Sequence, residues 1–181
     1  ALDATEEDWA DTMDINGKGV VFPDQAAARQ MIAEGHGGSI INIDSIAALN
    51  GVSPILMAYC ASKAAVNIMT QVASLEADSM TSIVAVAPGI IETRMQRIIR
   101  EMPEDRFPDV DDFRKLKQQG ELLHPVDAAI ALAWLLRTAP LSLSGRFLDA
   151  RGDGVLRDRN GEGESAVLRA KQWFDVLEAE A

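Results

Sequence analysis

The chain has 181 residues, of which 48% are hydrophobic and 25% are charged, and it carries a formal net charge of -11 at pH 7. This length and apolar content suffice for one globular core, and they exclude a disordered or collagen-like chain. Because a strongly negative surface repels phosphate backbones and anionic lipids, we expect no nucleic-acid partner and no membrane association.

Further features concern the setting and the extent of the protein. The longest apolar run, residues 128–136, is far shorter than the roughly 20 residues that span a bilayer, so no transmembrane segment is predicted. The single cysteine, Cys60, cannot form an internal disulfide, and no secretory leader is recognisable, so we expect a cytoplasmic protein. The chain starts at Ala1 without a methionine and enters a helical pattern at once, from which we expect that its front part has been removed.

The first part of the chain is predicted to form a broken helix and then a strand. Thr5 precedes a run of acidic residues, which is typical of a helix N-cap. Apolar residues continue at loosely helical spacing to Ala33, and a kinked or two-part helix is predicted because three residues interrupt it: Gly17, Gly19 and Pro23. Glycines within 35–38 end the helix, and residues 39–44 form a β-rich run that predicts a strand.

The remaining elements alternate in the same way. Small and apolar residues predict a mostly buried helix over 57–77, and the apolar run 81–87 predicts a parallel strand covered on both faces. Residues 92–122 have no clean period and are interpreted as an irregular excursion over the surface. A helix is predicted over 125–136 and a third strand over 145–150. This order predicts an α/β fold with a parallel sheet.

The last residues are interpreted separately from this domain. We divide the chain into residues 1–154 and residues 155–181, the latter comprising a charged loop and an amphipathic C-terminal helix. Residues 158–164 resemble a calcium loop, but Arg169 stands where a bidentate glutamate should close it. His36 and His124 also lack partners at metal-ligand or triad spacing, so no metal site is predicted.

The candidate chemistry lies on the helix over 57–77 and at the strand ends beside it. Tyr59 is the one tyrosine, and Lys63 follows four residues later, which places both side chains on one face of the helix. A nearby ammonium favours the phenolate form of a phenol, so the pair is suited to proton transfer. Ser45 follows the first strand and Pro88–Thr93 follow the second. Because open parallel sheets bind ligands at the carboxyl ends of their strands, these groups are expected to converge on one crevice.

These segments resemble the short-chain dehydrogenase/reductase family. Residues 42–48 are similar to its serine-bearing strand end, residues 59–65 to its tyrosine-lysine helix and residues 88–93 to its nicotinamide-side loop. Residues 14–16 are similar to its asparagine segment, and residues 144–147 resemble the start of its last strand. The resemblance covers about residues 5–154 and implies a Rossmann-like, doubly wound parallel sheet whose N-terminal nucleotide-binding strands are missing from this chain.

The resemblance also implies roles for individual residues. Tyr59 is expected to be the general acid or base, and Lys63 to assist its ionisation and to hold the nicotinamide ribose. Ser45 is expected to bind the substrate oxygen, and Asn16 to hold a water in the proton relay to Lys63. The resemblance implies contacts with NAD or NADP for these residues: Tyr59, Lys63, Pro88, Gly89, Ile91 and Thr93.

Two hypotheses of different classes follow. The first is an NAD(P)-dependent oxidoreductase that interconverts an alcohol and a ketone or aldehyde, forms a homodimer or homotetramer, and binds its substrate with residues 94–123. The alternative is a truncated, non-catalytic fragment that serves as a binding or oligomerisation module, with residues 40–43 as an open sheet edge. The sequence leaves the substrate and the choice between NAD and NADP open.

Overall fold

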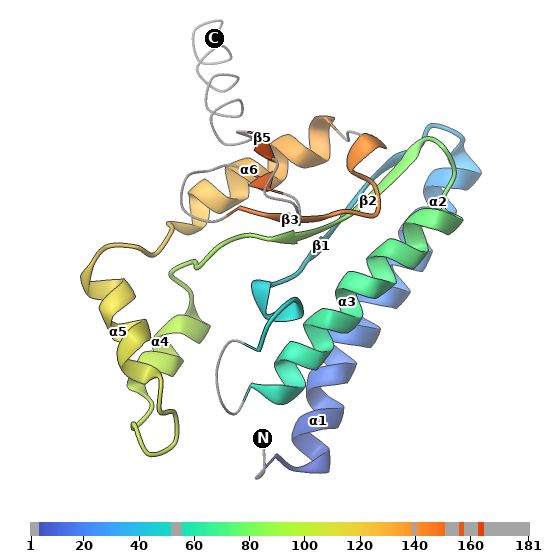
Figure 1. The fold of residues 1–181 in the computed structure, drawn as a ribbon. Coiled ribbons are helices and arrows are strands. Elements are labelled where there is room, and N and C mark those ends of the chain that lie inside the picture. The colour runs from blue at the N-terminus through green and yellow to red at the C-terminus, as the bar shows by residue number, and fades with distance from the viewer. Residues whose placement is uncertain (1–3, 52–55, 139–140, 151–155, 158–162, 165–181) are drawn as a thin grey trace, which may run out of the picture.

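The computed structural model describes residues 4–51, 56–138, 141–150, 156–157 and 163–164. Within these residues a sheet is covered by helices on both faces (Figure 1). The expected C-terminal helix and most of the calcium-like loop lie outside the described residues. None of the helices that the structure describes is long and apolar enough to cross a membrane.

The sheet has the strand order β1-β2-β3-β4-β5. Its first three strands, β1 (Gly38–Ile43), β2 (Thr81–Ala87) and β3 (Phe147–Asp149), are parallel, which confirms the predicted α/β class. The stretch expected as a loop before the C-terminal helix contains two strands of two residues, β4 (Leu156–Arg157) and β5 (Gly163–Glu164). These two strands pair antiparallel. The prediction that the stretch is a loop was wrong at these residues, because such short strands carry no alternating apolar pattern.

The helix before β1 is in two parts, as the sequence predicts. Helix α1 (Glu6–Met13) leads through a π-helical turn (Asp14–Lys18) into α2 (Gly19–Glu34). The backbone N–H of Gly19 bonds to the carbonyl of Asp14, five residues back, so the extra residue of the π turn makes the break. Pro23 lies inside α2 beyond that break.

The start of α1 shows why the helix begins where the sequence predicts. The Thr5 hydroxyl accepts the backbone N–H of Asp8 at 3.1 Å, and the Asp8 carboxylate accepts the backbone N–H of Thr5 at 3.1 Å. This capping box satisfies N–H groups that have no partner inside the helix.

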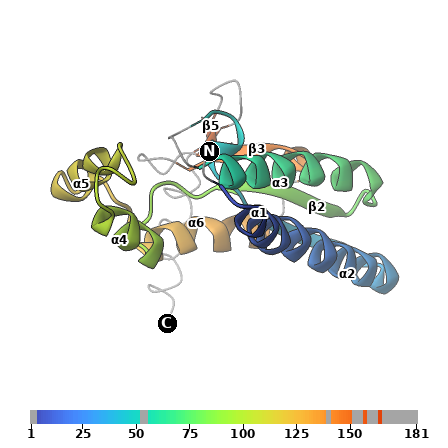
Figure 2. The ribbon, with the colours of Figure 1, turned by 90° about the horizontal axis from the view of Figure 1, so that it is seen from below.

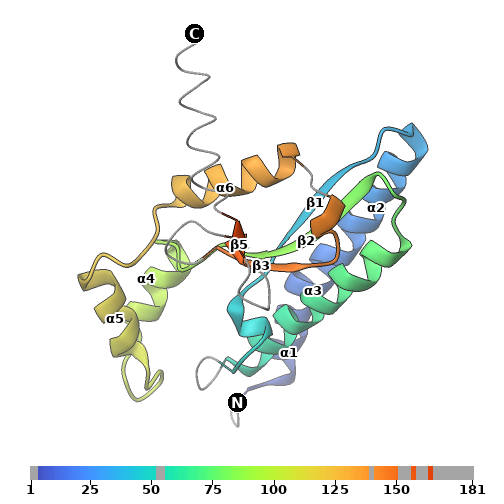
Figure 3. The same cartoon turned by 45° about the horizontal axis from the view of Figure 1, so that its top comes forward.

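The other helices divide between the two faces and one end of the sheet. Helix α3 (Met57–Glu76) lies beside α2 on one face, and α6 (Pro125–Thr138) covers the opposite face (Figure 3). Helices α4 (Arg94–Glu101) and α5 (Val110–Gln118) lie beyond the carboxyl end of β2 (Figures 1 and 2). The 3-10 turns are η2 (Ile46–Ala48) and η3 (Leu141–Leu143).

The expectation that residues 92–122 form an irregular excursion is therefore wrong, because this segment contains α4 and α5. Its two prolines fall between these helices and not inside either of them, so they separate two short helices. The connection is anchored by Phe107, which is 1% exposed and packs on the ring of Phe113 at a centroid distance of 5.3 Å.

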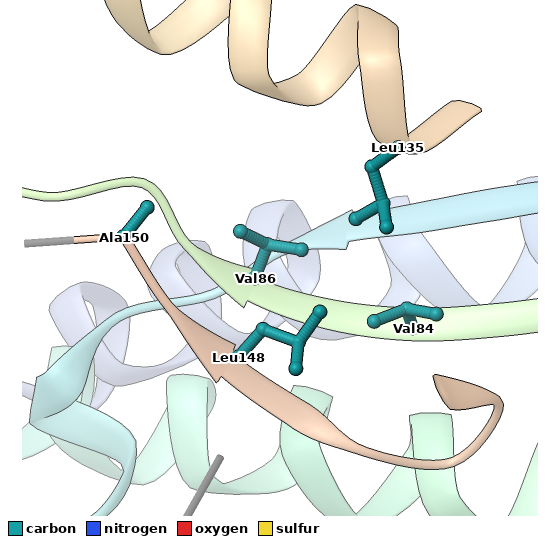
Figure 4. Packing of buried hydrophobic residues seen from close by; sticks show 5 residues of the cluster. All are labelled: Val84, Val86, Leu135, Leu148 and Ala150. Atoms are coloured by element: carbon teal, nitrogen blue, oxygen red, sulfur yellow. The ribbon is translucent and has the colours of Figure 1, made fainter. Parts of the chain in front are cut away.

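The main core joins α6 to the sheet. Val84 and Val86 of β2 and Leu148 of β3 point to the same face, and Leu135 of α6 packs against them (Figure 4). Each of these side chains is at most 2% exposed. Removing water from this much apolar surface is the dominant favourable term that holds α6 in place.

Helix α3 is not mostly buried as the sequence predicts. Its buried positions are mainly polar: Ser62, Asn67 and Thr70, with Val66. Its outward face instead carries apolar side chains, of which Leu75 is 84% exposed. The prediction rested on composition, which does not tell whether an apolar face packs within the chain or remains open.

Candidate functional site

The end of β1 carries Asp44 and Ser45. The N–H of Asp44 donates to the carbonyl of Val86 at 2.7 Å, so pairing with β2 continues one residue past β1. Ser45 then caps the turn η2, where its hydroxyl oxygen accepts the N–H of Ala47 at 3.2 Å. Because η2 packs against α3, the serine lies at the carboxyl end of the strand beside that helix.

Tyr59 and Lys63 occupy the face of α3 that turns toward this strand end. The ammonium nitrogen of Lys63 lies 5.9 Å from the centre of the Tyr59 ring. The same nitrogen donates to the carbonyl of Ile43, the last residue of β1, at 2.9 Å. This hydrogen bond fixes the lysine at the tip of the strand and leaves other N–H groups of the ammonium available.

Asn16 reaches the same helix from the π turn. Its side-chain N–H donates to the hydroxyl of Ser62 at 2.9 Å, and that hydroxyl donates to the carbonyl of Tyr59 at 2.8 Å. Ser62 is fully buried and directly precedes Lys63. The π turn therefore places the asparagine beside the tyrosine-lysine turn of α3.

The loop after β2 is held by the residue that follows β3 and by the segment that precedes α6. Gly89 adopts a φ of +91°, and a Cβ there would lie 2.7 Å from Leu123 Cδ1 and 3.4 Å from the carbonyl oxygen of Ala150. Ile91 forms a parallel bridge with Leu123, and the hydroxyl of Thr93 caps α4 by accepting the N–H of Gln96 at 3.4 Å. Glycine is favoured at position 89 because this backbone angle strains any residue with a side chain, and the end of the Leu123 side chain lies where a Cβ would be.

Asp44 is a site residue that the sequence analysis did not single out. It is 3% exposed, and its Oδ1 accepts the N–H of Ser45 at 2.8 Å. Burial raises the pKa of Asp44 to about 6, while the N–H of Ser45 and the charge of Lys63 act in the opposite direction. Burial likewise lowers the pKa of Lys63, an effect that Asp44 partly offsets. The available signal was a carboxylate at the end of an apolar strand, immediately before the candidate serine.

A second charged cluster ties the loop after β2 to the two helices beyond it. The carboxylate of Glu92 contacts Arg100 of α4 at 2.7 Å and Lys117 of α5 at 2.9 Å. Hydrogen bonds from Lys117 and then from Arg100 hold the pKa of Glu92 below its ordinary value. Arg114 of α5 donates to the carbonyls of Arg100 and Met102 of the neighbouring helix end, both at 3.1 Å. The loop, α4 and α5 thus form one connected unit.

The described residues contain no group of three or more His, Cys, Asp or Glu side chains arranged to hold a metal ion. The donors at the strand ends are instead hydroxyl, amine and backbone groups. Such a set suits an organic ligand that carries hydroxyl and amide groups.

A sheet whose first three strands are parallel, with helices on both faces and polar groups at its strand ends, defines an α/β protein. Residues 1–104 match the profile of the short chain dehydrogenase family. Because this match covers more than half of the chain, the chain belongs to that family.

Individual relatives agree with this assignment. A benzil reductase ((S)-benzoin forming) of Bacillus cereus is 41% identical over 104 residues, which cover 55% of this chain and 41% of the relative. An NAD-dependent glycerol dehydrogenase of Listeria innocua is 34% identical over 158 residues, which cover 87% of this chain and 59% of the relative. The chain thus spans about half the length of these curated relatives.

A solved structure is similar over most of the described fold. It is a crystal structure of a 2-deoxy-d-gluconate 3-dehydrogenase, described as putative, from Agrobacterium tumefaciens with bound NADP. The TM-score is 0.70 at 27% sequence identity, and the match covers 84% of this chain and 60% of that chain. Relatives named as dehydrogenases and reductases support an oxidoreductase and do not favour the alternative of a non-catalytic module.

Proposed function

We propose that this chain carries the catalytic residues of an NAD(P)-dependent oxidoreductase that interconverts an alcohol and a ketone or aldehyde. The observation that carries the proposal is the placement of Tyr59 and Lys63 on one face of α3, with the lysine bonded to the end of the strand that Ser45 follows. Family membership and the names of the relatives support the same class of reaction.

In this proposal Tyr59 and Ser45 act on the substrate oxygen. During reduction the Tyr59 hydroxyl gives its proton to the carbonyl oxygen, and during oxidation the tyrosine takes the proton of the alcohol. The Ser45 oxygen accepts the N–H of Ala47, so its own O–H remains available to donate to the substrate oxygen as negative charge builds there.

The residues around the strand ends also fit a nicotinamide cofactor. NAD or NADP supplies the hydride when it is bound. Lys63 uses one of its N–H groups on Ile43, and others are available for ribose hydroxyls. Gly89 turns this loop with a backbone angle that other residues rarely adopt, and Thr93 and the Ile91 backbone follow on the same loop. We propose Pro88, Gly89, Ile91 and Thr93 as the nicotinamide side of the site.

Asn16 is proposed to complete the path by which protons leave the site. Its side chain is bonded to Ser62, the residue before Lys63, so the π turn lies against the base of the lysine. A water held there would connect the lysine to the solvent. The π turn, which is rare within helices and frequent at functional sites, supports this role.

We further propose that the protein forms a homodimer or homotetramer through α3 and the helices beside it. The outward face of α3 carries exposed apolar side chains at helical spacing, namely Met57, Ile68, Val72 and Leu75. Alanines at positions 61, 64 and 65 lie nearby on the helix and allow a second helix to approach closely. An apolar face of this kind favours burial against another copy.

Turnover of the full-length protein tests the proposed function. NADH or NADPH is mixed with the protein and a diketone such as benzil, and the reverse reaction is followed with glycerol and the oxidised cofactors. We expect oxidation or reduction of the nicotinamide, read as a change in absorbance, with at least one cofactor. Absence of turnover with every pairing of a ketone or alcohol panel and both cofactors would contradict the proposal.

A further inference from the structure

Asp44 is the one carboxyl group that is fully buried within the part of the chain that the structure describes. Its Oδ1 accepts the N–H of Ser45, but its Oδ2 is buried without a hydrogen-bond partner among the described residues. A buried carboxylate with an unpartnered oxygen lowers the stability of the fold unless its charge is compensated. A physical reason is therefore needed for an aspartate at this position.

The backbone around Asp44 connects it to Lys63. The N–H of Asp44 is bonded to Val86, and the carbonyl of the preceding residue, Ile43, accepts the Lys63 ammonium at 2.9 Å. The peptide unit between Ile43 and Asp44 is thus held by β2 on one side and by α3 on the other. The carboxyl of Asp44 and the ammonium of Lys63 are fixed to the same short segment, and no ion pair within 4.0 Å joins them directly.

The charged groups around Asp44 come from the helices on the same face of the sheet. Asp44 follows Asn42 by two residues, so both side chains point toward α2 and α3. Helix α3 contributes Lys63 together with the Tyr59 ring, and α2 contributes Asp24, whose carboxylate accepts the side chain of Asn42 at 2.7 Å. Strand β2 contributes the backbone of Val86. Lys63 is the cation that acts on Asp44.

We propose that Asp44 is a positioning residue of the site, which fixes the backbone of Ser45 and holds the amine of Lys63 in its ammonium form. Its role in turnover rests on the proposed function. The relation between the two charges does not, because it follows from the positions of Asp44 and Lys63 alone. Burial acts against both charges, and each reduces the cost of the other.

Chemical labelling of Lys63 tests the proposal in the full-length protein without any turnover. Trace acetylation with acetic anhydride is carried out over a range of pH, and the fraction labelled at Lys63 is measured by mass spectrometry. Only the neutral amine reacts, so the pH at which labelling of Lys63 is half of its maximum reports the ionisation of this amine. This pH is the midpoint of the labelling curve. In Asp44→Asn we expect the midpoint to fall by about one pH unit, as for the loss of a nearby opposite charge.

The matched control is Asp24→Asn, which removes a carboxylate on the same face that bonds to Asn42 and not to the strand end. This variant should leave the midpoint at the value of the unmodified sequence. The proposal is overturned if the midpoint in Asp44→Asn is unchanged, or if Asp24→Asn moves it equally.

A reciprocal measurement serves if Asp44→Asn does not fold. In Lys63→Met the loss of the ammonium should raise the pKa of Asp44, followed by NMR of the carboxyl carbon, and an unchanged value would overturn the proposal. The two proposals fail separately. A shifted midpoint in a protein without carbonyl reduction would overturn the oxidoreductase, and an unshifted midpoint in an active enzyme would overturn the role of Asp44.

Discussion

The buried carboxyl of Asp44 makes the stability of the fold depend on pH. Its folded pKa of about 6 is above the ordinary value of 3.8, so between these values the folded chain binds more protons than the unfolded chain, and stability falls as pH rises. We therefore expect Asp44→Asn to be the more stable form at pH 8, by about 3 kcal/mol. Near pH 4 the difference should nearly vanish because the folded aspartate is then protonated.

Urea unfolding at several pH values measures this difference. Asp24→Asn is the comparison, because burial also raises the pKa of Asp24, and its stability relative to the unmodified protein should therefore also grow as pH rises. If the free energy of unfolding of Asp44→Asn does not rise relative to that of the unmodified protein between pH 4 and pH 8, the burial of a charged carboxylate at this strand end is contradicted.

The placement of single residues of the candidate site was predictable where it follows from local spacing. Tyr59 and Lys63 share a helix face because four residues make about one turn, and Ser45 lies at a strand end because the apolar run before it stops there. The burial of Asp44 was not predictable, because it depends on how the chain packs around the strand end, as does the contact that Lys63 makes with Ile43 across the fold. Tertiary contacts of this kind are absent from a sequence pattern.

At the scale of elements, the position of α6 depends on a few apolar contacts with the sheet. Leu135 is 1% exposed and packs on β2 and β3, whereas the next residue, Leu136, is 47% exposed. We expect Leu135→Ala to lower the free energy of unfolding by about 3 kcal/mol, as is usual for a buried leucine. Leu136→Ala is the matched control and should cost less than about 1 kcal/mol. Equal losses measured in urea would show that α6 is not packed as described.

The arrangement of α4 and α5 depends on Glu92. Replacing its charge by Glu92→Gln removes the ionic contacts with Arg100 and Lys117, so both helices should exchange their amide hydrogens faster. The pKa of Glu92 is lowered in the fold. Its contribution to the stability of the fold is therefore present above the pKa that Glu92 has in the unfolded chain, and it is lost as pH falls through the pKa that Glu92 has in the folded chain. Glu121→Gln, at an exposed position of the same segment, should leave the exchange unchanged. Unaltered exchange in Glu92→Gln, measured by mass spectrometry at neutral pH, would contradict the connection.

Elements with a strong local signal matched the sequence prediction. The strand at 81–87 and the cap at Thr5 follow from an unbroken apolar run and a capping box. The helices within 92–122 were missed because their sequences are short and mostly charged, and their placement comes from Phe107 and Glu92 contacts between segments. Two-residue strands such as β4 exist only through pairing with a neighbour.

For the whole molecule, the exposed apolar face of α3 is the surface through which we propose that copies associate. Val72 is 49% exposed on this face, and Val126 is 55% exposed on α6, on the other side of the sheet. An aspartate buried between two apolar helices is strongly unfavourable, so Val72→Asp should dissociate the proposed homodimer or homotetramer. Val126→Asp should leave the assembly intact in sedimentation velocity. A monomeric protein before any substitution would contradict the proposed assembly.

The most direct test of the proposed chemistry removes one oxygen atom. Tyr59→Phe keeps the ring beside Lys63 but deletes the hydroxyl that is proposed to move the proton, and Cys60→Ser changes the adjacent residue as a control. The measurement is kcat/KM for carbonyl reduction by the full-length protein. We expect Tyr59→Phe to lower kcat/KM by about 100-fold or more, as for loss of a general acid, while Cys60→Ser retains it. A rate for Tyr59→Phe within a few-fold of the unmodified protein would contradict the proposed site.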